Sequence, residues 1–141
     1  MDSKFSKRIK DVLSYSREEA IRLGNDYIGT EHIFLGILRE GEGIAIDTLV
    51  NLGVNLPEVK RLIEGRVKPN QPDYSDFPEN IPLLKPAERA LKLIYLEAKA
   101  ANSTQINTGH LLLAILKDEN SLVTQILEDF KIDYVQVRQQ I

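Results

Sequence analysis

The stretch NDYIGTEHIFLGIL, residues 25–38, has a near copy later in the chain, STQINTGHLLLAIL, residues 103–116. The same shift of 78 residues, from 25 to 103, aligns residues 5–63 with residues 83–141 without a gap. Identical pairs in this alignment include Lys7/Lys85, Glu19/Glu97, Thr30/Thr108, His32/His110 and Leu38/Leu116. Self-similarity at one fixed offset indicates a structural repeat. The sequence therefore predicts two copies of one unit.

The segment between the copies is rich in proline. RVKPNQPDYSDFPENIP, residues 66–82, holds four of the six prolines in the chain. Proline lacks a backbone donor and stops a helix. We therefore expect a first repeat over residues 5–65, an extended linker over 66–82 and a second repeat over 83–141.

Helical periodicity and capping residues predict four helices in each repeat. Apolar residues recur at helical spacing after Ser6, and a Gly24 stop follows. Further helices are expected after Thr30, over residues 44–52, and from Asn55 to Gly65. In the second copy the expected starts are Thr108, Ser121 and Asp133. Since no alternating strand pattern competes, we predict an all-α fold of two pseudo-twofold repeats, eight helices, packed as one domain over residues 1–141.

Each copy of about 60 residues is too small to bury much surface alone. Two copies that pack face to face around a pseudo-twofold axis can share one core. Duplication is therefore expected to serve stability first.

Composition excludes several classes of protein. The 141 residues contain no cysteine, which removes disulfides and thiol chemistry, and the net charge of -3 argues against a general nucleic-acid binder. No run approaches the roughly 18 apolar residues of a membrane span, and residues 1–11 do not resemble a secretion signal. We expect a cytoplasmic protein that contacts neither membrane nor nucleic acid.

The search for a catalytic constellation finds none. His32 and His110 stand at equivalent repeat positions without a second ligand four residues away, so both are interpreted as structural. The GEG at residues 41–43 follows no strand and lacks the lysine of a phosphate-binding loop. The sequence predicts a non-catalytic domain without metal or cofactor. An unrecognised small enzyme is the weakest hypothesis.

The motif IGTEHIFLGILREGEGIA, residues 28–45, together with FSKRIKDVLSYSREEAIRLGNDY before it, resembles the N-terminal repeat domain of Clp-type AAA+ unfoldases, in particular that of ClpC. The resemblance covers essentially the whole chain. It implies two four-helix repeats that recruit substrates and adaptors. The ATPase modules of such a parent, which bind ATP and feed a ClpP peptidase, would lie outside this chain. It also implies a monomer for the isolated domain. The alternative is a stand-alone accessory protein that docks on a Clp protease complex.

The resemblance further implies a site for phosphorylated arginine. Glu31 matches the acidic residue that would bind the guanidinium, and Ser6 matches a hydroxyl at the first helix start, with Lys7 beside it as a candidate contact for the phosphate. In the second copy these positions are Gly109 and Leu84, so we expect only the first repeat to bind the ligand.

Two further readings of this region stay open. Phe5, together with Ser6 and Lys7, is a candidate protein-docking surface, as is the seam between the repeats. A purely structural role is the alternative, because Ser6 can cap a helix and Glu31 suits a first turn.

Overall fold

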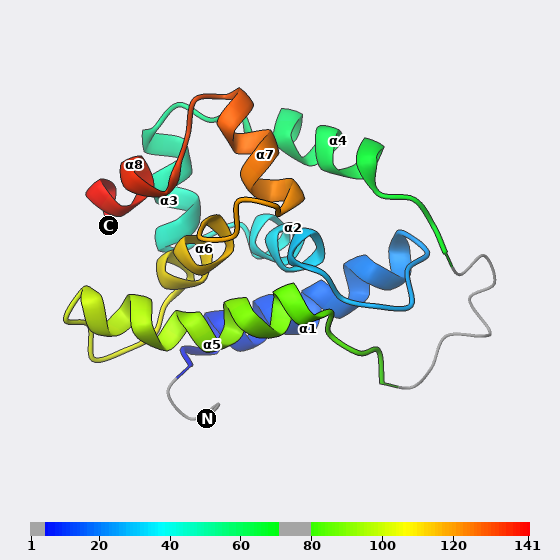
Figure 1. The fold of residues 1–141 in the computed structure, drawn as a ribbon, viewed down its shortest axis with the longest axis horizontal. Helices are drawn as coiled ribbons and strands as arrows, with labels where there is room; N and C mark the ends of the chain where they lie inside the picture. Colours follow the sequence, from blue (N-terminus) through cyan, green and yellow to red (C-terminus); the bar gives the residue numbers. More distant parts are fainter. Residues whose placement is uncertain (1–4, 71–79) are drawn as a thin grey trace.

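The computed structural model describes residues 5–70 and 80–141, and within these ranges it contains eight helices and no strand (Figure 1). The helices are α1 (Lys7–Arg22), α2 (Thr30–Glu40), α3 (Ile44–Asn51), α4 (Leu56–Arg66), α5 (Lys85–Ala100), α6 (Thr108–Leu116), α7 (Leu122–Asp129) and α8 (Tyr134–Gln140). Each of the last four begins 78 residues after its counterpart among the first four, for example 85 after 7. The predicted all-α fold of two four-helix repeats is confirmed.

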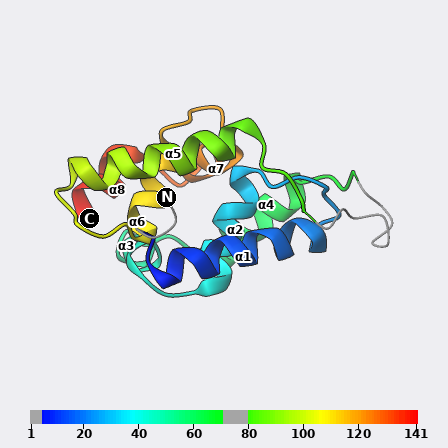
Figure 2. The ribbon, with the colours of Figure 1, turned by 90° about the horizontal axis from the view of Figure 1, so that it is seen from below.

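The two repeats share one core around α2 and α6. These helices lie in the middle of the molecule, with α1 and α5 along one side and α3, α4, α7 and α8 along the other (Figure 1). Seen from below, α1 and α5 lie apart and run in opposite directions (Figure 2). All nine residues of α6 are buried, as are seven of the eleven in α2. This burial explains why the repeated stretch is so apolar.

Most predicted helix starts are confirmed by capping hydrogen bonds. The side chains of Ser6, Asn55, Ser121 and Asp133 accept bonds from the backbone N–H groups of the first helical turns that follow them. Each bond satisfies a donor that has no partner within its helix. Gly24, with φ of +76°, follows the end of α1 as expected.

Three predicted boundaries are wrong. Thr30 is the first residue of α2 and not its cap, which is Gly29, and α3 ends at Asn51 rather than at residue 52. Thr108 begins α6 as expected, after the cap Asn107, and its buried hydroxyl accepts a hydrogen bond of 3.1 Å from the Ala45 backbone N–H in the other repeat. Gly65 does not end α4, which continues to Arg66.

Two short pairings cross between the repeats. Phe5, just before α1, pairs in parallel with Ile106, and Leu83, at the equivalent point before α5, pairs with Ile28. The Ser6 N–H donates to the Ile106 carbonyl at 3.2 Å, and the equivalent Leu84 N–H donates to the Ile28 carbonyl at 2.9 Å. Each repeat thus holds the first helix of the other in place.

Phe5 is part of this connection and is not a surface residue. Its side chain is 7% exposed and its ring stacks on Tyr95 with centroids 5.7 Å apart. The expected docking surface therefore loses its aromatic residue, because a partner cannot reach the Phe5 ring in the closed fold.

The start of the proposed linker is held against the first repeat. Asn25 Nδ2 donates to the Lys68 carbonyl at 2.9 Å, and the Asn70 N–H donates to the Gly24 carbonyl at 2.9 Å. Residues 71–79 of the predicted linker lie outside the described residues. The limits of the repeats and linker stay predictions.

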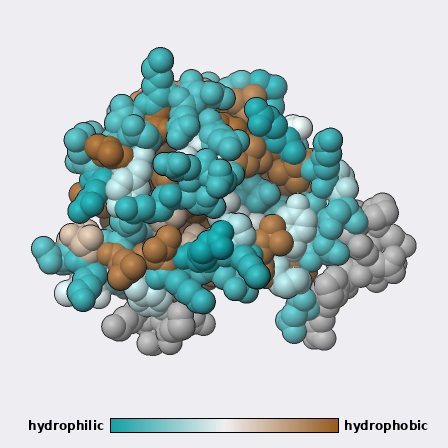
Figure 3. Space-filling model, viewed as in Figure 1, coloured by the Kyte–Doolittle hydropathy of each residue, from teal (hydrophilic) through white to brown (hydrophobic). Residues whose placement is uncertain are grey.

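Polar side chains cover most of the face seen in Figure 3, and apolar residues show there as separate patches. None of the helices in residues 5–70 and 80–141 is both long and apolar enough to cross a bilayer.

Candidate functional site

Glu31 lies at the positive end of α2, where its backbone is fixed by the turn at Gly29. The carboxylate folds back over Gly29, so closely that a β-carbon at that glycine would lie 1.9 Å from Glu31 Oε1. Burial raises the pKa of the Glu31 carboxyl, while a hydrogen bond from its own backbone N–H lowers it. A half-buried carboxylate of this kind gains from a bound cation, because the cation offsets the cost of desolvation.

A surface pocket of about 330 Å³ opens beside Glu31, between the two repeats. The first repeat contributes only the start of α2. The second contributes the start of α5 and the connection from α6 to α7. The residues that line the pocket are Gly29, Thr30, Glu31, Leu84, Pro86, Arg89, Asp118, Asn120, Ser121 and Leu122. The crossed pairing of Ile28 with Leu83 holds these two helix starts together.

The pocket carries both signs of charge. Glu31 and Asp118 supply carboxylates, and Arg89 supplies an exposed guanidinium. A second hollow of about 250 Å³ shares Thr30, Pro86, Arg89 and Asp118 with the first and continues along α5. A ligand with a cationic and an anionic group at opposite ends fits this distribution of charge.

Ser6 and Lys7 lie elsewhere. At the start of α1, Arg8 pairs with Glu40, at the end of α2, with a distance of 2.8 Å between Arg8 Nη1 and Glu40 Oε1. The two helices therefore run antiparallel, and the eleven residues of α2 span roughly 16 Å at 1.5 Å per residue. Glu31 stands at the far end of that helix from Ser6. The expected combination of Glu31, Ser6 and Lys7 in one repeat is not assembled.

Leu84, not Ser6, is the helix-start residue beside Glu31. Ser6 instead accepts a bond from the Ile9 N–H and sits next to Ile106, near the start of α6. The role of each residue in binding stays a prediction. The pocket beside Glu31 combines the start of α2 from one repeat with the start of α5 from the other.

The equivalent position in the second repeat is closed. A β-carbon at Gly109 would lie 2.8 Å from Ile44 Cγ2 and 3.0 Å from Ile141 Cδ1, so the neighbours leave no room for a glutamate without moving. The helix start is capped there by Asn107, whose Oδ1 accepts from the Gly109 N–H at 2.9 Å. Where the first repeat has Gly29 and Glu31, the second has Asn107 and Gly109. In the second repeat the Asn107 side chain caps α6, and in the first the Glu31 carboxylate lies over Gly29 at the start of α2.

The structural interpretation of the histidines is confirmed. His32 Nδ1 accepts a hydrogen bond from the Gly29 N–H at 2.9 Å, which assigns the proton to Nε2, 2.8 Å from Asn25 Oδ1. His110 Nδ1 accepts likewise from the Asn107 N–H at 3.1 Å. Burial lowers the pKa of His32 to about 4 and also lowers that of His110. In residues 5–70 and 80–141 no three His, Asp or Glu side chains form a group that could hold a metal ion.

The family model that matches the chain is the Clp repeat (R) N-terminal domain, over residues 4–130. The chain belongs to the Clp repeat N-terminal domain family. Over its whole length this Clp repeat domain is 31% identical to the negative regulator of genetic competence ClpC/MecB of Bacillus subtilis and 36% identical to a probable ATP-dependent Clp protease ATP-binding subunit of Chlamydia pneumoniae. It spans 17% and 16% of the length of these relatives.

The fold agrees with that of a solved Clp domain. The N-terminal domain of the chaperone ClpD from Arabidopsis thaliana matches with a TM-score of 0.74 at 14% identity, covering 98% of this chain and 92% of that one. At this identity the likeness concerns the fold alone. The description of the Glu31 pocket therefore uses only residues of this Clp repeat domain and nothing from the ClpD structure.

Sequence reasoning missed Arg89 and Asp118. They are 58 and 87 residues away from Glu31 in sequence, and only the packing of the repeats brings them together. The duplication was the one signal in the sequence for these two residues, since a pseudo-twofold axis can bring the start of one repeat beside the second helix of the other.

Proposed function

We propose that the chain is the substrate- and adaptor-recognition module of an ATP-dependent Clp unfoldase. Family membership over residues 4–130 supports this proposal, and so does a pocket with both signs of charge at the seam between the repeats. The module acts by binding and not by catalysis. In this proposal ATP is bound by modules of the parent protein outside this chain, a separate ClpP peptidase is engaged indirectly through that parent, and the protein works in the cytoplasm.

The ligand that suits the Glu31 pocket best is the side chain of phosphorylated arginine. The observation that carries this proposal is the half-buried Glu31 carboxylate, which faces a pocket that also holds Arg89. The carboxylate can accept charge-assisted hydrogen bonds from the guanidinium group, and Arg89 can donate to the phosphoryl oxygens. The start of α5 adds the partial positive charge of a helix N-terminus on the same side.

Isothermal titration calorimetry with free phosphoarginine and with arginine tests the proposal. We expect one site per chain for phosphoarginine and weaker binding of arginine by at least tenfold, because arginine lacks the anionic half. Glu31→Gln should lower the affinity for phosphoarginine by at least tenfold, since a bond to a charged group contributes about 1.5–3 kcal/mol.

A matched control removes a charge at the opposite end of the antiparallel pair α1 and α2. Lys7→Ala removes a cation close to the start of α1 and should leave the affinity within about twofold. Equal affinity for arginine and phosphoarginine, or an unchanged affinity in Glu31→Gln, would exclude phosphoarginine as the ligand of this pocket.

A further inference from the structure

The Glu31 pocket continues into the hollow of about 250 Å³ that runs along α5. The two share four lining residues, among them Pro86, Arg89 and Asp118, so they meet along a common rim. Beyond this rim the second hollow is lined by Ala90 and Leu93 of α5, by Ala114 of α6 and by Lys117 directly after α6. We call it the α5–α6 hollow.

The part of the α5–α6 hollow beyond the rim is apolar. Ala90 and Ala114 are buried, and Leu93 is half-buried. The Nζ of Lys117 lies 4.5 Å from the centroid of the Tyr134 ring, which is not part of the hollow, so Lys117 contributes its aliphatic stem to the lining. The hollow therefore suits an apolar side chain and not a second charged group.

The hollow opens here because α6 carries an alanine where α2 carries a glycine. Ala114 is the counterpart of Gly36, 78 residues earlier. A β-carbon at Gly36 would lie 2.6 Å from the Val12 carbonyl oxygen, so α1 and α2 approach closely only because that position has no side chain. The β-carbon of Ala114 excludes the same close approach of α5 to α6, since atoms in a packed interior cannot overlap.

The rim of the hollow also lacks a bridge that the first repeat has. The counterparts of Pro86 and Asp118 are Arg8 and Glu40, which form an ion pair with 2.8 Å between Nη1 and Oε1. A proline side chain has no donor, so Pro86 cannot form this bridge to Asp118. The boundary between the α5–α6 hollow and the Glu31 pocket is therefore left open.

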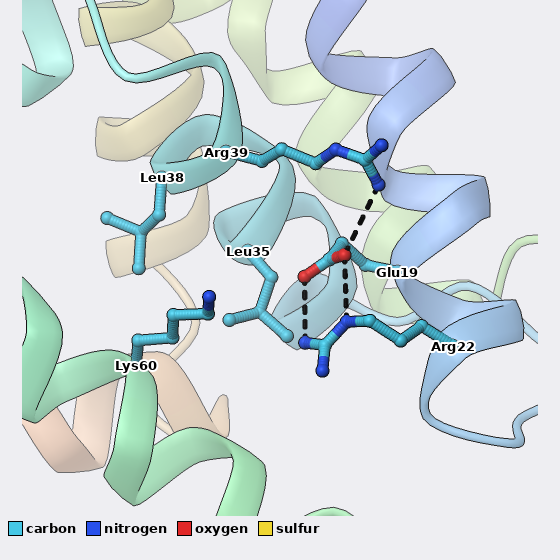
Figure 4. A pocket seen from close by; sticks show the side chains of 6 residues that line it. All are labelled: Glu19, Arg22, Leu35, Leu38, Arg39 and Lys60. Carbon is cyan, nitrogen blue, oxygen red and sulfur yellow. Dashed lines mark hydrogen bonds and ion pairs between the residues drawn. The ribbon is translucent and has the colours of Figure 1, made fainter.

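The cleft between α1, α2 and α4 is larger, at about 430 Å³, but does not extend the Glu31 pocket. It shares no residue with that pocket or with the α5–α6 hollow. Its two arginines are already bound to Glu19, at 2.9 and 3.0 Å from Arg22 and 3.4 Å from Arg39 (Figure 4). Arg39 also lies over the Tyr15 ring, 4.8 Å from its centroid. These contacts explain the cleft as part of the packing of the first repeat.

We propose that the α5–α6 hollow is a specificity subsite, which binds an apolar side chain of the polypeptide that carries phosphoarginine. This inference rests on the proposed function, because phosphoarginine has to occupy the adjoining Glu31 pocket. A phosphoarginine that belongs to a protein brings its own main chain to this surface. A side chain close to it in sequence then lies within reach of the hollow.

The geometry of an extended chain decides which residue enters the hollow. Successive side chains of such a chain point to opposite sides, so the residue next to phosphoarginine points away from the domain. The residue two positions away points to the same side as phosphoarginine, about 7 Å further along the chain. We therefore assign the hollow to an apolar residue two positions from phosphoarginine.

Three pentapeptides with phosphoarginine at the centre test this assignment by titration calorimetry with the whole chain. The first is Leu-Gly-phosphoarginine-Gly-Leu, the second is Gly-Leu-phosphoarginine-Leu-Gly, and the third has glycine at all four flanking positions; all are acetylated and amidated. We expect the first to bind about fivefold more tightly than the other two, because it alone buries a leucine side chain. The first two have the same composition, so general hydrophobicity does not distinguish them.

Two variants on α5 locate the effect. Leu93→Gln places an amide of similar size in the hollow, and Leu96→Gln is the matched control, at a residue that is 61% exposed and outside the hollow. Leu93→Gln should reduce the preference for the first peptide over the second to less than about twofold, whereas Leu96→Gln should keep it. Both should bind free phosphoarginine as the wild type does, which also shows that they fold.

Equal affinities of the first two peptides for the wild-type chain would overturn the subsite. So would an undiminished preference in a Leu93→Gln variant that binds free phosphoarginine. In both cases binding of free phosphoarginine would leave the proposed function standing. A chain that binds neither free phosphoarginine nor any of the three peptides would overturn the proposed function and the subsite together.

Discussion

Among single residues, equivalent positions of the two repeats have different structural roles. Glu31 bends over a glycine that offers no capping side chain, whereas Gly109 follows an asparagine that does. Sequence comparison detects the loss of the acidic residue at position 109. It does not detect the reason, because Ile44 and Ile141, which occupy the space, come from distant parts of the chain.

The buried histidine of the first repeat predicts a pH dependence of stability. The pKa of His32 is about 4 in the folded chain, below its unfolded value near 6.5, so the unfolded state binds more protons between these values. Stability from the neutral ring is fully present above about pH 6.5 and is lost as the pH falls toward 4. The expected loss is about 3 kcal/mol over this window.

Urea denaturation at pH 7, 5.5 and 4.5 measures this effect. Glu31, whose pKa is raised by burial, opposes the trend in part near the acidic end, because its protonated form is favoured by folding. The matched variant is His32→Gln, in which the fall in stability between pH 7 and 4.5 should be smaller than in the wild type. An identical pH profile in both proteins would show that His32 is not the group responsible.

At the scale of helices, caps predicted most starts because a capping bond is a local event. The sequence Ser6 to Ile9, or Asp133 to Gln136, contains both partners. The cap of α2, expected at Thr30, was misjudged by one residue, whereas α6 begins at Thr108 as expected. In the second repeat the better capping residue, Asn107, stands directly before the threonine, and in the first the cap is a glycine that carries no signal.

Helix packing in the first repeat depends on one glycine. A β-carbon on Gly36 would lie 2.6 Å from the Val12 carbonyl oxygen and 2.7 Å from Ser16 Oγ, so α1 and α2 approach too closely there for any side chain. Gly36→Ala should destabilise the fold by about 1–3 kcal/mol, since the overpacking outweighs the gain in helix propensity.

Gly65 provides the matched substitution for Gly36. It also lies in a helix, and a β-carbon there would meet no atom within 4 Å. Gly65→Ala should therefore stabilise the fold by up to about 1 kcal/mol. Chemical denaturation of both variants measures the difference, and equal effects would mean that the close approach at Gly36 costs nothing.

At the scale of the whole molecule, the crossed pairings make the repeats dependent on each other. The duplication predicted a shared core, but the exchange of helix starts between the repeats could not be read from either copy. That exchange explains why Glu31 shares a pocket with Leu84 and Arg89 of the second repeat. The sequence of the first repeat alone had suggested Ser6 as its neighbour.

Mutual dependence predicts a single cooperative unfolding transition. The amides of Ile28 and Leu84, which donate to Pro82 and Ile28, should exchange hydrogen only through global opening, as slowly as the buried amides of α6. Hydrogen exchange followed by NMR measures this protection. Exchange of either amide well before α6 opens would show that the repeats separate while each remains folded.

We propose that recognition takes place in a pocket that both repeats form. Calorimetric titration of phosphoarginine into Arg89→Ala and Ser6→Ala, compared with the wild type, tests it most directly. We expect Arg89→Ala to lower the affinity at least tenfold and Ser6→Ala to change it by less than about twofold. A large loss in Ser6→Ala with an unchanged affinity in Arg89→Ala would contradict a composite site and return the ligand to the start of α1.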